Sequence, residues 1–252
     1  MLDRKAFLRP IAHRGLHDAA KGIIENTAPA FLAALAKGYG IECDLRPAAN
    51  SRPIVFHDDT IERLVDGTGP TTALTNSDLQ RLRYKGHDTP ILSFGELLDM
   101  AGGRVPLLVE VKGEWQPPDM DFLRQIADLA WRYRGPIALM SFDPALMTAM
   151  GALAPGVPRG IVSGLYRNDD PEGWWGNVLS PERQERLSHL LESKQAAPDF
   201  YAYHVKALPT PVTRFVREVL GLPLFTWTVR TEDDRARAKQ WADAPIFEGY
   251  AA

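Results

Sequence analysis

The sequence has few of the features that mark membrane, secreted or nucleic-acid-binding proteins. Its 252 residues include one cysteine, Cys43, which excludes an intramolecular disulfide. No apolar run reaches the length of a membrane span, and the first residues lack the apolar core of a secretion signal. The formal net charge is only -3, so broad attraction to nucleic acid or to an anionic membrane is not expected. We therefore expect a cytoplasmic protein without a transmembrane segment or a nucleic-acid partner; its oligomeric state is left open.

A further absence concerns the fold. No Gly-rich dinucleotide fingerprint follows the first predicted strand, which disfavours the main competing architecture, an open doubly wound sheet. Hydrophobic residues make up 45% of the chain and charged residues 24%, which is ordinary for a globular protein with a full core. Short apolar runs alternate with helical patterns along the whole chain, and no flexible linker divides it. We predict an α/β fold, a single-domain (β/α)8 TIM barrel over residues 1–252.

The predicted elements follow from local signals. Ser93, with Glu96 three residues later, forms a capping box at the start of one helix. A nearly continuous apolar run at 105–112 is typical of a parallel strand buried on both faces. The eight strands are expected at 10–15, 41–46 with an extension at 53–58, 105–112, 136–142, 159–164, 200–205, 224–229 and 245–248. Helices are expected at 27–37, 76–83, 93–101, 119–134, 144–153, 181–194, 211–220 and 231–242.

The second strand carries an unusual pair of acids. Glu42 and Asp44 are two residues apart, so both side chains point to one face of the strand while Cys43 points to the other. Two carboxylates on a covered strand repel each other and resist desolvation unless a positive charge lies between them. A divalent cation bound by oxygen ligands is the simplest candidate. The alternative is a structural ion pair with Arg46.

Other predicted strands also end in residues that can do chemistry. In a TIM barrel the carboxyl ends of the strands meet at the face that holds the active site. Histidine, arginine, lysine and acids therefore converge there, which favours a catalytic site over scattered surface charge. Asp58 could orient a neighbouring histidine, whereas Glu110 and Lys112 could also pair only with each other. The residues expected at this face are His13, Glu42, Asp44, His57, Glu110 and Lys112, and Arg14 and Asp58 directly follow two of them.

The order of these residues resembles the glycerophosphodiester phosphodiesterase family. Each motif alone is common, but the ordered set over about a hundred residues is specific. A weaker similarity continues at Ser141-Phe142 and at Trp227-Thr228-Val229. The dense part of the resemblance comprises His13-Arg14-Gly15, Glu25-Asn26-Thr27, Ala30-Phe31, Ala34, Gly38, Glu42-x-Asp44, His57-Asp58 and Glu110-x-Lys112.

The resemblance implies a TIM barrel that hydrolyses a small-molecule glycerophosphodiester to glycerol 3-phosphate and an alcohol. It also implies a divalent metal, Mg²⁺ or Ca²⁺. In the related phospholipases a neighbouring substrate hydroxyl attacks first and forms a cyclic phosphate, and the resemblance suggests the same here. It implies that Glu42, Asp44 and Glu110 bind the metal, that His13 and His57 form an acid–base pair, that Arg14 and Lys112 bind phosphate, and that Trp227 lines the pocket. Within the pair we take His13 as the base and His57 as the acid.

The sequence departs from the family pattern at three places. The turn at 47–52 differs from the usual one, without consequence for the chemistry. Glu248 stands where the family usually has a Thr/Ser-Asp pair, which leaves the register of the last strand open. The adjacent Trp174 and Trp175 match no family feature, and they leave the choice of substrate open.

Two other functions remain compatible with the sequence. One is a different diesterase specificity, such as lysophospholipase D or sphingomyelinase D-like activity, for which the two tryptophans could touch lipid. The other is a barrel that binds phosphoesters without turning them over. The remaining histidines are interpreted as structural or exposed, although one of them, His204, ends a predicted strand. They are His17, His87, His189 and His204.

Overall fold

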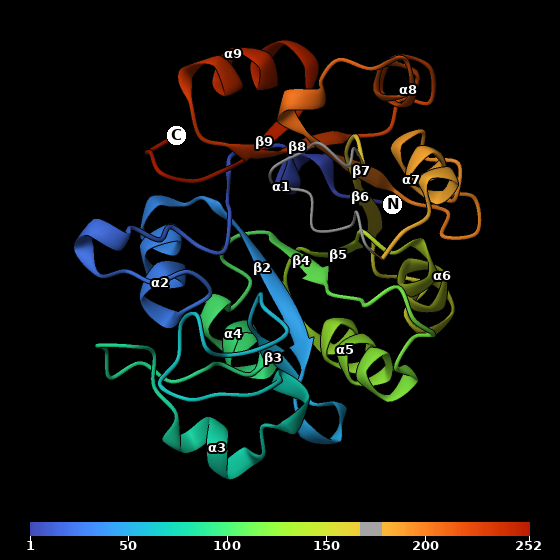
Figure 1. Ribbon diagram of the computed structural model, residues 1–252. Helices are drawn as coiled ribbons and strands as arrows, with labels where there is room; N and C mark the ends of the chain where they lie inside the picture. The colour runs from blue at the N-terminus through green and yellow to red at the C-terminus, as the bar shows by residue number, and fades with distance from the viewer. Residues whose placement is uncertain (167–177) are drawn as a thin grey trace.

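The computed structural model describes residues 1–166 and 178–252, and it shows a closed barrel of parallel strands surrounded by helices (Figure 1). Eight strands run parallel in the order β1-β9-β8-β7-β6-β5-β4-β2, and a pairing between β1 and β2 closes the ring. The predicted (β/α)8 fold is therefore confirmed. The strands are β1 (Ile11–Ala12), β2 (Gly40–Pro47), β3 (Pro53–Val55), β4 (Leu107–Val111), β5 (Ile137–Ser141), β6 (Arg159–Ser163), β7 (Phe200–His204), β8 (Leu224–Val229) and β9 (Ala244–Phe247).

The predicted extension of the second strand is a separate strand with its own direction. β3 runs antiparallel to the outer end of β2, with Val55 opposite Leu45, and it stands outside the ring of eight. The turn between them contains Asn50 and Ser51 at positive φ. This hairpin extends β2 beyond the barrel and places the segment after Val55 over the carboxyl ends of the strands.

The first strand is shorter than predicted. It ends at Ala12 because Arg14 and Gly15 adopt φ values of +53° and +78°, which no strand accommodates. A Cβ at Gly15 would lie 2.9 Å from Ala30, so only glycine fits this turn. β1 is nevertheless fixed on both sides, because Ile11 pairs with Gly40 of β2 and with Ile246 of β9.

Two apolar layers stabilise the barrel. One lies between the strands and the outer helices, where strand residues such as Val109 and Leu139 pack against helix residues such as Ile126. The other fills the barrel interior, where Phe200 and Phe225 stack edge to face at 5.3 Å. Phe7 of the first short helix is buried in this inner layer and so covers the end of the barrel opposite the candidate site.

The helices lie outside the barrel and mostly match the sequence prediction. The Ser93–Glu96 capping box is present, with both reciprocal hydrogen bonds. The helix predicted at 181–194 ends at Ser188, and the one predicted at 211–220 continues as a π-helical turn over Phe215–Val219. The helices are α1 (Arg4–Phe7), α2 (Ala28–Lys37), α3 (Asn76–Arg81), α4 (Phe94–Ala101), α5 (Met120–Arg132), α6 (Pro144–Leu153), α7 (Pro181–Ser188), α8 (Pro211–Arg214) and α9 (Glu232–Trp241).

Two sequence expectations concern the protein's surroundings. Among the helices in the described ranges, none combines the length and the apolar character that crossing a membrane requires. Trp174 and Trp175 lie outside the described residues, so the interpretation of this pair as a lipid contact stays a prediction.

Candidate active site

Three buried carboxylates meet at the carboxyl ends of two neighbouring strands. Asp44 of β2 and Glu110 of β4 are paired in register, and Glu42 lies two residues before Asp44 on the same face. Their solvent exposures are 1% for Glu42, 1% for Asp44 and 7% for Glu110. One oxygen of each lies within 4.8 Å of the others, which is close enough for a single cation to contact all three.

The three acids are only partly neutralised by protein cations. Lys112 Nζ lies 2.8 Å from Asp44 Oδ1 and 2.5 Å from Glu110 Oε1, and Arg14 Nε lies 3.2 Å from Asp44 Oδ2. Burial disfavours ionised Asp44, but Lys112, His57 and Arg14 outweigh it and hold the pKa of Asp44 well below its usual range. Asp44 is therefore a fixed negative charge at the centre of the cluster.

Glu42 lacks such compensation. Its Oε2 accepts a hydrogen bond of 2.9 Å from the backbone N–H of Arg14, and the nearest histidine nitrogen, Nε2 of His13, is 4.0 Å away. Burial, followed by the charges of Asp44 and Glu110, raises the pKa of Glu42 well above its usual range. A buried carboxylate in this position is best stabilised by a cation, so the residues present fit a divalent metal.

One candidate catalytic histidine lies on the loop after β3. His57 Nδ1 is 2.8 Å from Asp58 Oδ1, and Arg63 Nε donates to Asp58 Oδ2 at 2.5 Å. Because an ionised carboxylate only accepts hydrogen bonds, His57 carries a proton on Nδ1. Arg63 also donates to Glu25, which pairs with Arg14 at 2.7 Å and so links this histidine to the carboxylate cluster.

The other candidate histidine follows β1. His13 Nδ1 lies 2.6 Å from Glu248 Oε2, and Glu248 also accepts a hydrogen bond from Arg230 through Oε1. Burial lowers the pKa of His13, although its hydrogen bond to Glu248 opposes that effect. The proton on Nδ1 is directed at Glu248, and the lone pair of the neutral ring is on Nε2, the nitrogen nearer to Glu42.

Most of these groups line one cavity of about 560 Å³. One side of it is polar and holds Glu42, Glu110, both histidines, Arg14 and Lys112, and Asp44 contacts the last two of these. The other side is aromatic: Trp227 stacks on His204 with ring centroids 4.9 Å apart and meets Phe142 edge to face at 5.2 Å. A ligand with an anionic end and a less polar body matches this division.

The structure also decides between alternatives that the sequence allowed. Arg46 does not neutralise the acid pair, because it pairs with Glu114 and donates from Nε to the backbone carbonyl of His57 at 2.8 Å. The alternative of a structural ion pair with Arg46 is therefore ruled out in favour of the other candidate, a bound cation. Glu110 and Lys112 do not pair only with each other, since Lys112 also contacts Asp44. The hypothesis that Asp58 orients a histidine agrees with its contact to His57.

Residues 13–248 match the sequence profile described as the Glycerophosphoryl diester phosphodiesterase family. The chain belongs to this family. The resemblance drawn from the ordered motifs is thus confirmed, and so is the expectation that the chain is an enzyme, a phosphoric diester hydrolase. The match begins at His13 and ends at Glu248, so the two residues that meet across the barrel closure bound it.

Individual members of the phosphodiesterase family resemble the chain over most of its length. The glycerophosphodiester phosphodiesterase of Caldanaerobacter subterraneus subsp. tengcongensis is 26% identical over 246 residues, which cover 90% of this chain and 88% of the relative. The glycerophosphodiester phosphodiesterase of Bacillus subtilis (strain 168) is 25% identical over an alignment of 264 residues including gaps, which covers 95% of this chain and 83% of the relative.

Solved structures share the barrel. An Oleispira antarctica phosphodiesterase, solved in complex with the product sn-glycerol-3-phosphate, superposes with a TM-score of 0.72 at 21% identity, covering 95% of this chain and 92% of the other. The glycerophosphodiester phosphodiesterase of Thermotoga maritima gives a TM-score of 0.70 at 20% identity, covering 95% and 93%. At these identities the similarity establishes the fold of this phosphodiesterase chain.

The residues predicted for the site, Trp227 among them, line the cavity, except Asp44, which contacts its lining through Lys112. Contacts made by other residues were missed. Glu248 was read only as a departure from the family pattern, yet it holds His13. Asn26, at φ +56°, donates from Nδ2 to Asp44 Oδ2 at 2.8 Å. The contact of Asn26 could have been predicted, because this asparagine belongs to the Glu-Asn-Thr motif that carries the family resemblance. His204, interpreted as structural or exposed, lines the cavity beside Trp227.

Proposed function

We propose that the chain catalyses metal-dependent hydrolysis of glycerophosphodiesters to glycerol 3-phosphate and an alcohol. The observation that carries this proposal is that two histidines, each with a carboxylate at Nδ1, line the same cavity as Glu42 and Glu110 of the three-acid cluster. The complex of the Oleispira antarctica relative with sn-glycerol-3-phosphate supports the choice of substrate class. We further propose that residues 1–252 act as one domain.

Glu42, Asp44 and Glu110 would hold the metal. Their donors are all oxygen atoms, which favours Mg²⁺ or Ca²⁺ over ions that prefer nitrogen or sulfur. When bound, the ion would supply positive charge beside the phosphate and stabilise the charge that develops there. The three carboxylates are held by strand pairing and by Asn26, so their arrangement does not depend on flexible loops.

Arg14 and Lys112 would bind the phosphate. Both cations line the cavity, and their side chains are only 18% and 11% exposed, so water screens their charge weakly. In this structure they contact Asp44, so a phosphodiester anion would share them with that carboxylate. Their positions match the transition-state role of cations in phosphoryl chemistry.

His13 would act as the base and His57 as the acid. Neutral His13 presents the Nε2 lone pair, so it can accept the proton of the attacking hydroxyl. His57 beside ionised Asp58 and its partner Arg63 has a counter-ion for the imidazolium form, which can give a proton to the leaving alkoxide. The attacking group would be the neighbouring glycerol hydroxyl, and water would then open the cyclic phosphate. Trp227 would line the pocket around the rest of the substrate.

Release of glycerol 3-phosphate from glycerophosphocholine tests the proposal. Purified protein is assayed with Mg²⁺, with Ca²⁺ and with a chelator, beside His13→Ala, His57→Ala and the control His189→Ala, an exposed histidine outside the cavity. Activity that requires a metal and both histidines is the expected result. Turnover of a lysolipid but not of glycerophosphocholine would replace the substrate class. Binding of glycerophosphocholine without any product would make the chain a non-catalytic binder.

A further inference from the structure

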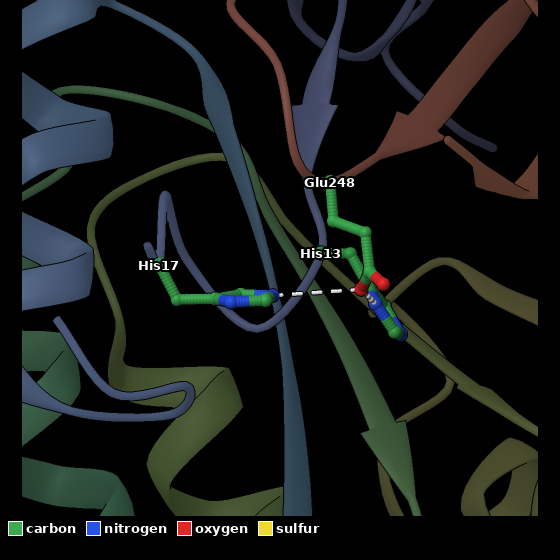
Figure 2. Close-up of side chains that lie close together, drawn as sticks. All are labelled: His13, His17 and Glu248. Atoms are coloured by element: carbon green, nitrogen blue, oxygen red, sulfur yellow. Dashed lines mark hydrogen bonds and ion pairs between the residues drawn. The ribbon is translucent and has the colours of Figure 1, made fainter. Parts of the chain in front are cut away.

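A second group of metal-ligating side chains lies beside the proposed site. It comprises His13, His17 and Glu248, and one donor atom of each lies within 4.8 Å of the other two. Figure 2 shows both imidazole rings turned toward the Glu248 carboxylate. The separations are 2.6 Å from His13 Nδ1 to Glu248 Oε2 and 3.4 Å from His17 Nε2 to the same oxygen. His17 has no part in the function proposed above.

The fold fixes these three donors in place. Ala12 of β1 is the register partner of Phe247 of β9, so the residues that follow them, His13 and Glu248, lie side by side. Two residues at positive φ, Arg14 and Gly15, then fold the chain back and bring His17 to the same carboxylate. The donors thus come from three positions that the barrel closure and one tight turn define.

The carboxylate is oriented toward both rings. Arg230 donates to Glu248 Oε1, which leaves Oε2 directed at the two nitrogens. Nε2 of His17 is buried and forms no hydrogen bond of good geometry within the described parts of the chain. A buried ring nitrogen that faces a carboxylate oxygen without such a hydrogen bond is available to coordinate a metal ion.

We propose that His13, His17 and Glu248 form a second metal site, which takes an ion of the Zn²⁺ class. Two imidazole nitrogens and one carboxylate oxygen are the ligand set of open, three-residue zinc sites, with a fourth position for water. Bonds of zinc length in tetrahedral arrangement separate donors by about 3.3 Å, close to the 3.4 Å between His17 and Glu248. The 2.6 Å between His13 and Glu248 is a hydrogen-bond distance, and it has to lengthen when the ion replaces the proton on Nδ1. The nitrogen donors distinguish this site from the all-oxygen cluster of Glu42, Asp44 and Glu110.

Occupation of this site changes the proton on His13. A metal at Nδ1 uses the lone pair of that atom, so the proton of the neutral ring moves to Nε2. Nε2 can then donate a hydrogen bond but cannot accept a proton. Zn²⁺ would therefore inhibit the diesterase without displacing the ion of the oxygen cluster; this consequence, unlike the binding, rests on the proposed function.

Metal titration of the full chain tests the binding. Zn²⁺ is added in the presence of excess Mg²⁺, and free Zn²⁺ is followed by competition with a chromogenic chelator; Co²⁺ replaces Zn²⁺ for a visible spectrum. Wild type and Asp44→Asn are expected to bind one tight equivalent. His17→Gln should weaken it by about tenfold or more, because one ligand is lost. His189→Gln, which changes an exposed histidine away from the site, should bind as wild type does.

Three results would overturn the proposal or part of it. Unchanged Zn²⁺ affinity in His17→Gln, in a variant whose circular dichroism spectrum shows a folded barrel, excludes the site. Loss of the equivalent in Asp44→Asn instead places the ion in the oxygen cluster. With Mg²⁺ alone, His17→Gln should keep its diesterase activity, and Zn²⁺ should not inhibit that activity. If the wild-type enzyme binds Zn²⁺ through His17 and remains fully active, the proposed effect of the metal on His13 is refuted. Absence of diesterase activity in the wild type refutes the proposed function only.

Discussion

The Nδ1 atom of His57 lies 2.8 Å from Oδ1 of its chain neighbour Asp58, although consecutive residues of a regular strand point to opposite faces. β3 has already ended at Val55, and the chain after it bends so that both side chains face the same way. Arg63 holds the other carboxylate oxygen. Asp58 is thereby a positioning residue for His57.

Asp58→Asn should lower kcat by roughly tenfold to a hundredfold, since an amide can present its own N–H to Nδ1 and select the wrong tautomer. The change should leave KM nearly unaltered, because the carboxylate acts on kcat through the orientation of His57. Asp59→Asn, one residue along, serves as the control. A variant with wild-type kcat would show that His57 needs no orientation by this carboxylate.

His13→Ala and His57→Ala should each reduce kcat by about a hundred- to ten-thousand-fold, with smaller effects on KM, because proton transfer belongs to the transition state. The losses should be strongly non-additive in the double variant. A nitrophenyl ester, whose phenolate needs little protonation, should restore His57→Ala more than His13→Ala. Rescue of His13→Ala instead would exchange the two roles, and losses confined to KM would reduce both histidines to phosphate binding.

Glu42 gives the metal-free protein a pH-dependent stability. Burial, then Asp44 and Glu110, raises its pKa in the folded state, so folding favours the protonated form. Stability is full below the pKa of the unfolded chain, about 4.3, and is lost as pH rises toward the folded value. In a chelator, urea denaturation should therefore show stability falling from pH 5 upward over this window. Glu42→Gln should flatten the slope, and excess Mg²⁺ or Ca²⁺ should remove it in the wild type. A steeper slope in Glu42→Gln would contradict this account.

Gly160→Ala should destabilise the barrel. A Cβ at this position of β6 would overlap the Phe200 ring in the inner apolar layer, and overpacking of this kind costs about 1–3 kcal/mol. A Cβ at Gly95, in the first turn of α4, would meet no atom within 4 Å, so Gly95→Ala should be neutral or stabilising by up to about 1 kcal/mol. Thermal melts of the two variants check the pair, and equal melting temperatures would show that the interior yields.

The carboxylate cluster was predictable from the strand pattern. A spacing of two on a covered strand places Glu42 and Asp44 on one face, and parallel pairing brings Glu110 to the same level as Asp44. The strand alternation likewise predicted the barrel. The antiparallel direction of β3 and some element bounds were not predicted. At β1, for example, the positive φ of Arg14 ends the strand, and no local pattern of apolar residues marks that end.

The contacts that close the barrel could not be predicted in this way. Glu248 and His13 are 235 residues apart, and their meeting depends on the register of β9 against β1. Without that register, Glu248 appears only as a departure from a motif. The same holds for Arg63 and Glu25, whose pairing joins two loops that no local pattern relates.

The two-residue β1 strand also has a consequence for synthesis. Its partner β2 follows it closely in the chain, whereas its other partner, β9, is the last strand of the barrel, so one edge of β1 has no partner until β9 has been synthesised. Until then His13 has no Glu248 to fix its proton, and the ring of strands is incomplete. In the proposed mechanism a nascent chain is therefore inactive until Glu248 has emerged and β9 has paired, and the appearance of activity during translation reports the closing of the barrel.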